Sequence, residues 1–125
     1  PADLHNLRVL VVDDDRESVE AVRAVLQDAG AVVDTAISAD EARRELATVS
    51  PDVLISDLAM PREDGYAFVQ SLREARVTIP AIALTAYARR DDAERALAAG
   101  FQVHLSKPVD PWHLVDTVAH LARPV

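Results

Sequence analysis

The sequence predicts a single α/β domain, residues 1–125, built on a doubly wound parallel sheet. Three observations support this prediction: strand-like and helix-like segments alternate five times, the strand-like segments are short apolar runs rich in β-branched residues, and the connections are short. Such runs are typical of strands that are covered on both faces of a parallel sheet. Right-handed crossovers between the strands place helices on both faces.

The first part of the chain contains three predicted strands and two predicted helices. The first helix has apolar residues at three- and four-residue spacings and stops at Gly30, a residue type favoured after helix ends. The second helix begins at a capping box formed by Ser38 and Glu41, and Pro51 separates it from the third strand. The predicted strands are 7–12, 31–36 and 53–57, and the predicted helices are 16–29 and 38–48.

The second part of the chain contains three predicted helices and two predicted strands. Pro80 precedes the fourth strand, and Gly100 is expected to cap the fourth helix. Asp110 and Pro111 combine an N-cap residue with Pro at the first helical position, which predicts the start of the last helix. After a loop over 58–63, the predicted helices are 64–75, 90–99 and 111–121, and the predicted strands are 81–85 and 101–106.

Composition excludes several classes of protein. The formal net charge is −8, which repels nucleic acid. The chain has no Cys, which excludes disulfides and thiolate metal sites, and no apolar stretch approaches the roughly 20 residues that cross a bilayer. We therefore expect a cytoplasmic domain that contacts neither nucleic acid nor membrane directly. The sequence leaves its oligomeric state open.

Charged residues follow three of the predicted strands. Asp13 and Asp14 come after the first strand, Asp57 ends the third, and Lys107 follows the fifth. In open parallel sheets ligands bind outside the carboxyl ends of the strands, so these side chains are expected to lie together. Crowded carboxylates either take up protons or bind a cation, and ligands that are all oxygen suit Mg²⁺. The sequence therefore predicts a magnesium site.

The same residues suit phosphoryl transfer. A carboxylate can attack phosphorus and form an aspartyl phosphate, while a metal ion and an ammonium group counter the charge on the transferring oxygens. Asp57, the acidic pair Asp13 and Asp14, and Lys107 would divide these roles.

Four short motifs stand at the ends of predicted strands. They are Val-Val-Asp-Asp-Asp at 11–15, Ser-Asp-Leu-Ala-Met-Pro at 56–61, Ala-Leu-Thr-Ala at 83–86 and Leu-Ser-Lys-Pro at 105–108. In this order and at this spacing they resemble the receiver domain of the two-component response-regulator family, over essentially the whole chain. The resemblance implies a flavodoxin-like fold with the strand order 2-1-3-4-5.

The resemblance also implies a reaction and its metal site. Asp57 would accept a phosphoryl group from a phosphohistidine on a partner histidine kinase or histidine phosphotransfer protein. Mg²⁺ would be held by Asp14 and Asp57, by Asp13 through water, and by the backbone carbonyl of Ala59. Such a domain promotes its own phosphorylation and relays it by a conformational change, rather than acting as an enzyme on a substrate.

Three further residues are assigned roles in the switch by the resemblance. Thr85 would turn toward the phosphoryl oxygens and Lys107 would pair with them. His104 stands where the family often has Tyr or Phe, whose rotation couples phosphorylation to the output face. The Lys107–Pro108 bond is a candidate cis bond, because this bond is commonly cis in the family.

Ala59 and Tyr87 occupy positions that in the family influence how readily water reaches the acyl phosphate. Ala59 has no polar side chain to orient water, and Tyr87 is bulky enough to shield the phosphoryl group. We therefore predict a comparatively persistent aspartyl phosphate.

Four residues have a structural interpretation beside the functional one. Asp15 is expected to cap a helix rather than bind a metal ion, and Gly65 to serve backbone geometry in its loop. Trp112 is expected to pack against the domain rather than recognise a partner. His104, on an edge strand, could be exposed in both states and take no part in the switch.

Two other functions and two kinds of parent chain remain open at this stage. A haloacid-dehalogenase-like aspartyl phosphatase would need a second Asp two residues after Asp57, where this chain has Ala59. A flavodoxin-type FMN carrier would need a phosphate-cradling loop after the first strand, where Asp13 and its neighbours repel phosphate. The chain could be a single-domain regulator or the receiver of a hybrid histidine kinase. The run over 96–111 resembles receivers of hybrid kinases and favours the second possibility.

Overall fold

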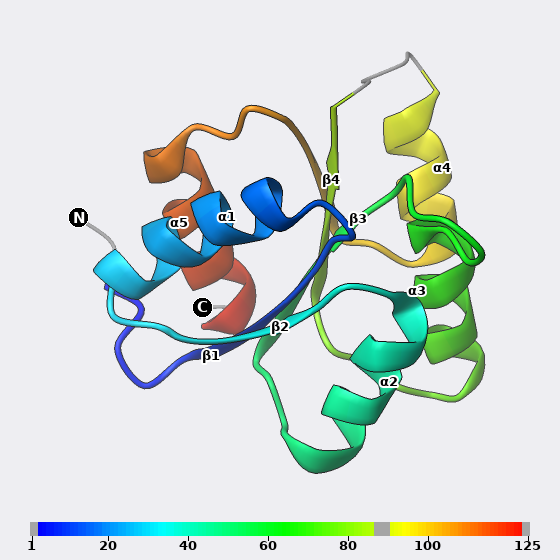
Figure 1. The fold of residues 1–125 in the computed structure, drawn as a ribbon, viewed down its shortest axis with the longest axis horizontal. Helices are drawn as coiled ribbons and strands as arrows, with labels where there is room; N and C mark the ends of the chain where they lie inside the picture. Colours follow the sequence, from blue (N-terminus) through cyan, green and yellow to red (C-terminus); the bar gives the residue numbers. More distant parts are fainter. Residues whose placement is uncertain (1–2, 87–90, 124–125) are drawn as a thin grey trace.

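The computed structural model describes residues 3–86 and 91–123, which form five parallel strands and five helices (Figure 1). The sheet has the order β2-β1-β3-β4-β5, so the predicted flavodoxin-like topology is confirmed. None of the helices in these ranges is long and apolar enough to cross a membrane. The strands are β1 Arg8–Val12, β2 Val32–Ala36, β3 Val53–Asp57, β4 Ala81–Thr85 and β5 Val103–Ser106; the helices are α1 Arg16–Asp28, α2 Ala39–Thr48, α3 Gly65–Glu74, α4 Asp92–Ala99 and α5 Pro111–Ala122.

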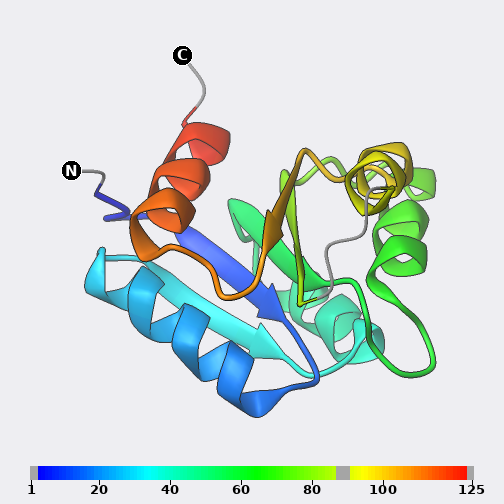
Figure 2. The same cartoon turned by 90° about the horizontal axis from the view of Figure 1, so that it is seen from above.

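The sheet separates two hydrophobic layers. Helices α1 and α5 cover one face, and α2, α3 and α4 cover the other (Figures 1 and 2). Alternate residues of β1 serve the two layers: Val9 and Val11 pack toward α1 and α5, whereas Leu10 and Val12 pack toward α2 and α3. This use of both faces explains why the run before Asp13 is continuously apolar.

Local signals at helix ends behave as the sequence predicts. Asp15, Ser38 and Asp110 are N-caps, and each side chain accepts a hydrogen bond from a backbone N–H of the first turn. Gly100 caps α4 with a φ of 117°, in the left-handed region that glycine favours. The Lys107–Pro108 peptide bond is cis, as expected.

The predicted start of the last strand is wrong by two residues. β5 begins at Val103 rather than at 101. The N–H of Phe101 donates to the carbonyl of Ala96 at 3.0 Å, so Phe101 closes the end of α4 instead of joining the sheet. The predicted start of α4 at 90 lies outside the described residues, and the described helix begins at Asp92. The other boundaries agree to within one residue.

Candidate functional site

The residues at the ends of the strands gather at one edge of the sheet. Asp13 follows β1, Asp57 ends β3, Thr85 ends β4 and Lys107 follows β5. Because all five strands are parallel, their carboxyl ends share this edge. Asp13, Asp57 and Thr85 are buried, with 2%, 7% and 5% of their surface exposed. Buried polar groups of this kind are tolerated only where partners or a ligand compensate them.

Asp13, Asp14 and Asp57 form an acidic cluster. Each offers one carboxylate oxygen, and these oxygens lie within 4.8 Å of one another. Asp13 Oδ1 accepts a hydrogen bond from the backbone N–H of Asp15 at 2.9 Å, which orients the carboxylate. Three carboxylates at these separations fit a hard divalent cation such as Mg²⁺, which keeps other positions for water and phosphate oxygens.

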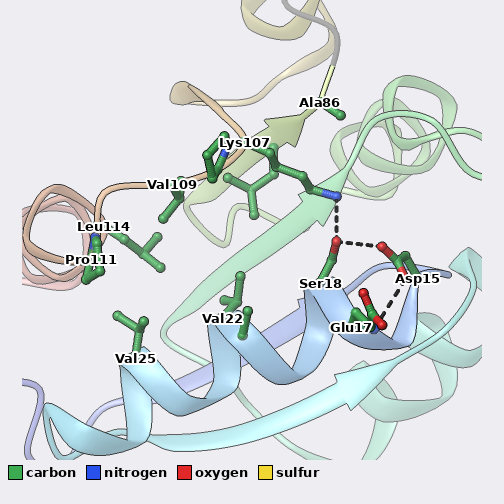
Figure 3. Close-up of a pocket in the computed structure, with 13 residues that line it drawn as sticks. Asp15, Glu17, Ser18, Val22, Val25, Ala86, Lys107, Val109, Pro111 and Leu114 are labelled. Carbon is green, nitrogen blue, oxygen red and sulfur yellow. Dashed lines mark hydrogen bonds between the residues drawn. The ribbon is translucent and has the colours of Figure 1, made fainter.

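The ammonium group of Lys107 reaches into the acidic cluster. Its Nζ lies 2.7 Å from Asp13 Oδ2 and 3.7 Å from Asp57 Oδ1. It also donates to Ser18 Oγ at 3.4 Å, and the Ser18 hydroxyl in turn donates to Asp15 Oδ2 at 2.9 Å (Figure 3). The ammonium therefore offsets part of the negative charge of the acidic cluster.

The sequence reasoning missed Ser18 as a neighbour of Lys107. The available signal was its position three residues after the helix cap Asp15, where a hydroxyl can return a hydrogen bond to the capping carboxylate. What that position could not reveal is that the hydroxyl also faces a lysine 89 residues further along the chain.

Asp57 has a strongly perturbed pKa. Burial, followed by repulsion from Asp13, raises the pKa of Asp57 to about 6. The charge of Lys107 and a hydrogen bond from the backbone of Ala59 oppose this rise, and Asp14 adds to it. Ionised Asp57 is thus held in an environment that disfavours its own charge, which a bound cation would relieve.

Gly65 permits a close approach between α3 and the chain that leaves β3. A Cβ at this position would lie 2.3 Å from the carbonyl oxygen of Asp57 and 2.9 Å from the Cα of Leu58. The Gly65 N–H donates to the Leu58 carbonyl at 2.9 Å and closes the base of the loop. The interpretation of Gly65 as a residue of backbone geometry is therefore confirmed.

Gly65→Ala should destabilise the domain and displace Asp57, because the contact to be relieved is with backbone rather than with a flexible side chain. We expect a loss of about 2 kcal/mol in the free energy of unfolding, within the usual range for overpacking. Urea denaturation with an unchanged slope measures this loss. A midpoint equal to that of the wild type would show that the loop moves aside freely.

Thr85 and His104 lie on neighbouring strands, β4 and β5, in which Ala83 pairs with His104 and Thr85 with Ser106. His104 is half-buried. Its Nε2 is buried and has no hydrogen-bond partner within the described part of the chain. The imidazole therefore points inward in this structure, and His104 is not the fully exposed edge-strand residue that was the alternative expectation.

Tyr87, the other residue expected to influence the phosphoryl group, lies outside the described residues.

A groove of about 530 Å³ borders the acidic cluster, between α1 and the segment that joins β5 to α5 (Figure 3). Most of its wall is apolar, with Val22, Val25 and Leu114 among the lining residues. Lys107 and Ser18 lie at the end where Asp15 also lines the groove.

The prediction that Trp112 packs against the domain is wrong. Its side chain is 72% exposed. The buried residues of α5 are Leu114, Val115 and Val118, which form a stripe at three- and four-residue spacing. Trp112 lies off this stripe and faces solvent.

Comparisons with known proteins agree with this geometry. The family model of the response regulator receiver domain matches residues 9–119. The chain is 45% identical to an uncharacterized 14.6 kDa protein in the sodA1 3' region of Leptolyngbya boryana, with 92% of this chain and 89% of that protein covered. It is 41% identical to the response regulator Rre1 of Synechocystis, with 92% and 51% covered.

A hybrid signal transduction histidine kinase D of Dictyostelium discoideum is 35% identical, with 94% of this chain and 8% of the kinase covered. Among solved structures, a Francisella response regulator receiver domain superposes with a TM-score of 0.88 at 28% identity, covering 94% of this chain and 97% of that one. The chain spans about half of Rre1 and a small part of the kinase. Its fold, its strand-end motifs and the match over residues 9–119 establish that the chain belongs to the response regulator receiver domain family.

Proposed function

We propose that this receiver domain accepts a phosphoryl group on Asp57 from a phosphohistidine of a partner histidine kinase or histidine phosphotransfer protein. The observation that carries the proposal is the convergence of Asp57 with two further carboxylates and the ammonium of Lys107 at the carboxyl edge of the sheet. The domain promotes its own phosphorylation by arranging these groups. It acts as a phosphoacceptor in two-component signalling and does not turn over a separate substrate.

The metal in this proposal is Mg²⁺, held by Asp14 and Asp57, by Asp13 through water, and by the backbone carbonyl of Ala59. When bound, it neutralises charge on the transferring phosphoryl oxygens. The supporting observation is the clustering of the three carboxylates, each of which offers one oxygen within 4.8 Å of the others.

In the reaction, a carboxylate oxygen of Asp57 attacks phosphorus. The new P–O bond forms as the P–N bond breaks, and the electron pair of the P–N bond stays with the departing imidazole. Lys107, which is 2.7 Å from Asp13 in this state, pairs with a phosphoryl oxygen in the product. Its ammonium can serve both sites because a long lysine side chain rotates with little strain.

The relay in this proposal starts at Thr85, whose hydroxyl turns toward the phosphoryl group. His104 follows, because its buried Nε2 lacks a described partner and its backbone pairs with Ala83 of β4, two residues before Thr85. Ring resonances of His104 should shift when beryllofluoride, a phosphoryl mimic, is added with Mg²⁺ in an NMR experiment. Resonances of the exposed His113 serve as the control. Unchanged His104 resonances would remove it from the switch.

The lifetime of the aspartyl phosphate is part of the same proposal. Ala59 cannot position water, and Tyr87 would shield the phosphoryl group, so spontaneous loss is slow. Ala59→Asn should therefore shorten the lifetime and Tyr87→Ala should do the same, as timed by loss of the phosphoryl mass. Equal lifetimes in the wild type and both variants would contradict this account.

The parent chain is proposed to be either a single-domain regulator or a hybrid histidine kinase, in the cytoplasm. The similarity to a segment of a hybrid kinase supports the second possibility. The comparisons support neither the dehalogenase-like phosphatase nor the FMN carrier, since the matching family model is that of receiver domains.

Intact-protein mass spectrometry tests the proposed function. Incubation with Mg²⁺ and acetyl phosphate should add one phosphoryl group that base removes, and a chelator should prevent the addition. A phosphohistidine phosphotransfer protein is the second donor, because some receivers react poorly with small donors. Failure with both donors, or transfer that is equally fast with chelator, would contradict the proposal.

A further inference from the structure

Arg43 connects α2 to the loop that carries Ala59. Its guanidinium makes two parallel hydrogen bonds to the carboxylate of Glu63, at 2.8 and 2.5 Å. It also donates to Ser71 Oγ of α3 at 2.7 Å and lies 5.4 Å from the ring centroid of Phe68. A weaker contact joins it to Asp40, one turn earlier on α2, at 3.2 Å. One side chain therefore ties α2, the loop and α3 together.

The pair between Arg43 and Glu63 is well formed but partly exposed. The two bonds have the fork geometry in which arginine and carboxylate match best. Arg43 holds the pKa of Glu63 below its usual range through this hydrogen bond. The side chains are 36% and 30% exposed, and pairs with such access to solvent add little to global stability. Its main effect should therefore be local.

The loop over 58–64, between β3 and α3, is restrained by the Arg43–Glu63 pair near its α3 end. Its base is closed by the hydrogen bond between Gly65 and Leu58, and Met60 is buried beneath it. Arg62 adopts a φ of 70°, a left-handed conformation that costs free energy in a residue other than glycine. Glu63 follows directly, so the bonds to Arg43 hold the chain immediately after the strained residue.

We infer that Arg43 is a positioning residue for the acidic site, which acts through Glu63 to hold the loop and present the Ala59 carbonyl beside Asp57. This inference rests on the proposed function, because it treats that carbonyl as part of the Mg²⁺ site. In this inference the side chain of Arg43 touches neither the metal nor the phosphoryl group. By fixing Glu63, it restrains the backbone of the preceding residues back to Ala59.

Arg43→Ala tests the inference, with Arg44→Ala as the matched control. Arg44 is the exposed neighbour on α2, and its replacement removes the same charge. In the metal-free protein, hydrogen exchange at the hydrogen-bonded amides of Ala59 and Glu63 should accelerate about tenfold in Arg43→Ala, because a local opening becomes easier. The affinity for Mg²⁺, measured by titration calorimetry, should fall about tenfold, the lower end of the range for residues that orient metal ligands. Arg44→Ala should match the wild type in both measurements.

Glu63→Gln separates the loop from the other contacts of Arg43. If Arg43 acts through Glu63, this variant reproduces both effects, and adding Arg43→Ala to it changes little further. Arg43→Lys, which keeps the charge but loses the fork, should fall between wild type and Arg43→Ala. Midpoints of thermal unfolding within a few degrees of the wild type show that the variants are folded.

Three results would overturn the inference. Exchange at the amides of Ala59 and Glu63 could be unchanged in Arg43→Ala, Arg44→Ala could have the same effect as Arg43→Ala, or Glu63→Gln could behave as the wild type. Absence of Mg²⁺ binding to the wild-type protein would instead contradict the proposed metal site. The exchange measurement still decides whether Arg43 holds the loop, so the two failures are distinguishable.

Discussion

Asp57→Asn is expected to abolish phosphoryl acceptance by this domain. A neutral amide is a far weaker nucleophile toward phosphorus than a carboxylate, and Asp57 is the acidic residue at the end of β3 that clusters with the other two carboxylates and lies 3.7 Å from Lys107 Nζ. Intact-protein mass spectrometry with Mg²⁺ and a donor that phosphorylates the wild type measures this loss. No other residue of the cluster has to be changed in this experiment.

Asp116→Asn is the matched control for this substitution. Asp116 is an exposed aspartate on α5, so its replacement changes the net charge equally and leaves the acidic cluster intact. It should gain the phosphoryl group at the rate of the wild type. A phosphoryl mass that persists in Asp57→Asn would show that another residue is the acceptor.

The same Asp57→Asn variant should be more stable than the wild type when no divalent cation is present. The folded state raises the pKa of Asp57 from 3.8 to about 6, so folding disfavours its charged form. Each pKa unit corresponds to about 1.4 kcal/mol, which gives up to about 3 kcal/mol; allowing for water at the cluster, we expect about 2 kcal/mol.

The pH dependence of this gain has a definite sign. Below about pH 3, well under the ordinary pKa of 3.8, Asp57 is protonated in both the folded and the unfolded state, so Asp57→Asn should have little effect through charge. As the pH rises from about 4 to 6, Asp57 ionises in the unfolded state while the folded state still holds it protonated, so the wild type loses stability progressively, whereas the variant does not. The difference in the free energy of unfolding should therefore be largest above pH 7.

Thermal unfolding in chelator at pH 4, 6 and 8 measures this difference, and a gain of 2 kcal/mol corresponds to roughly 8 °C in Tm. Adding Mg²⁺ at pH 8 should raise the Tm of the wild type more than that of Asp57→Asn, because the ion binds the folded carboxylate cluster. Asp116→Asn again serves as the control. An equal Tm for wild type and Asp57→Asn at pH 8 in chelator would mean that the cluster does not oppose ionisation of Asp57.

The sequence by itself determined the sheet, the helix ends and the edge where the site lies. Apolar runs identify the central strands β1, β3 and β4, because a strand covered on both faces is apolar at most of its positions. Asp15, Ser38 and Asp110 identify helix starts because each cap bonds to a backbone N–H only two or three residues away. Asp57 and Lys107 could be assigned to one edge because parallel strands share their carboxyl ends.

Only the tertiary structure decided which side chains meet across elements. Lys107 bonds to Asp13, which is 94 residues away, and also to the hydroxyl of Ser18, while Arg43 bonds to Glu63, 20 residues away. Such contacts depend on how each helix is rotated and how each loop is closed, and local spacing encodes neither. The same reason applies to Trp112, since only the packed face of α5 reveals that its ring points to solvent.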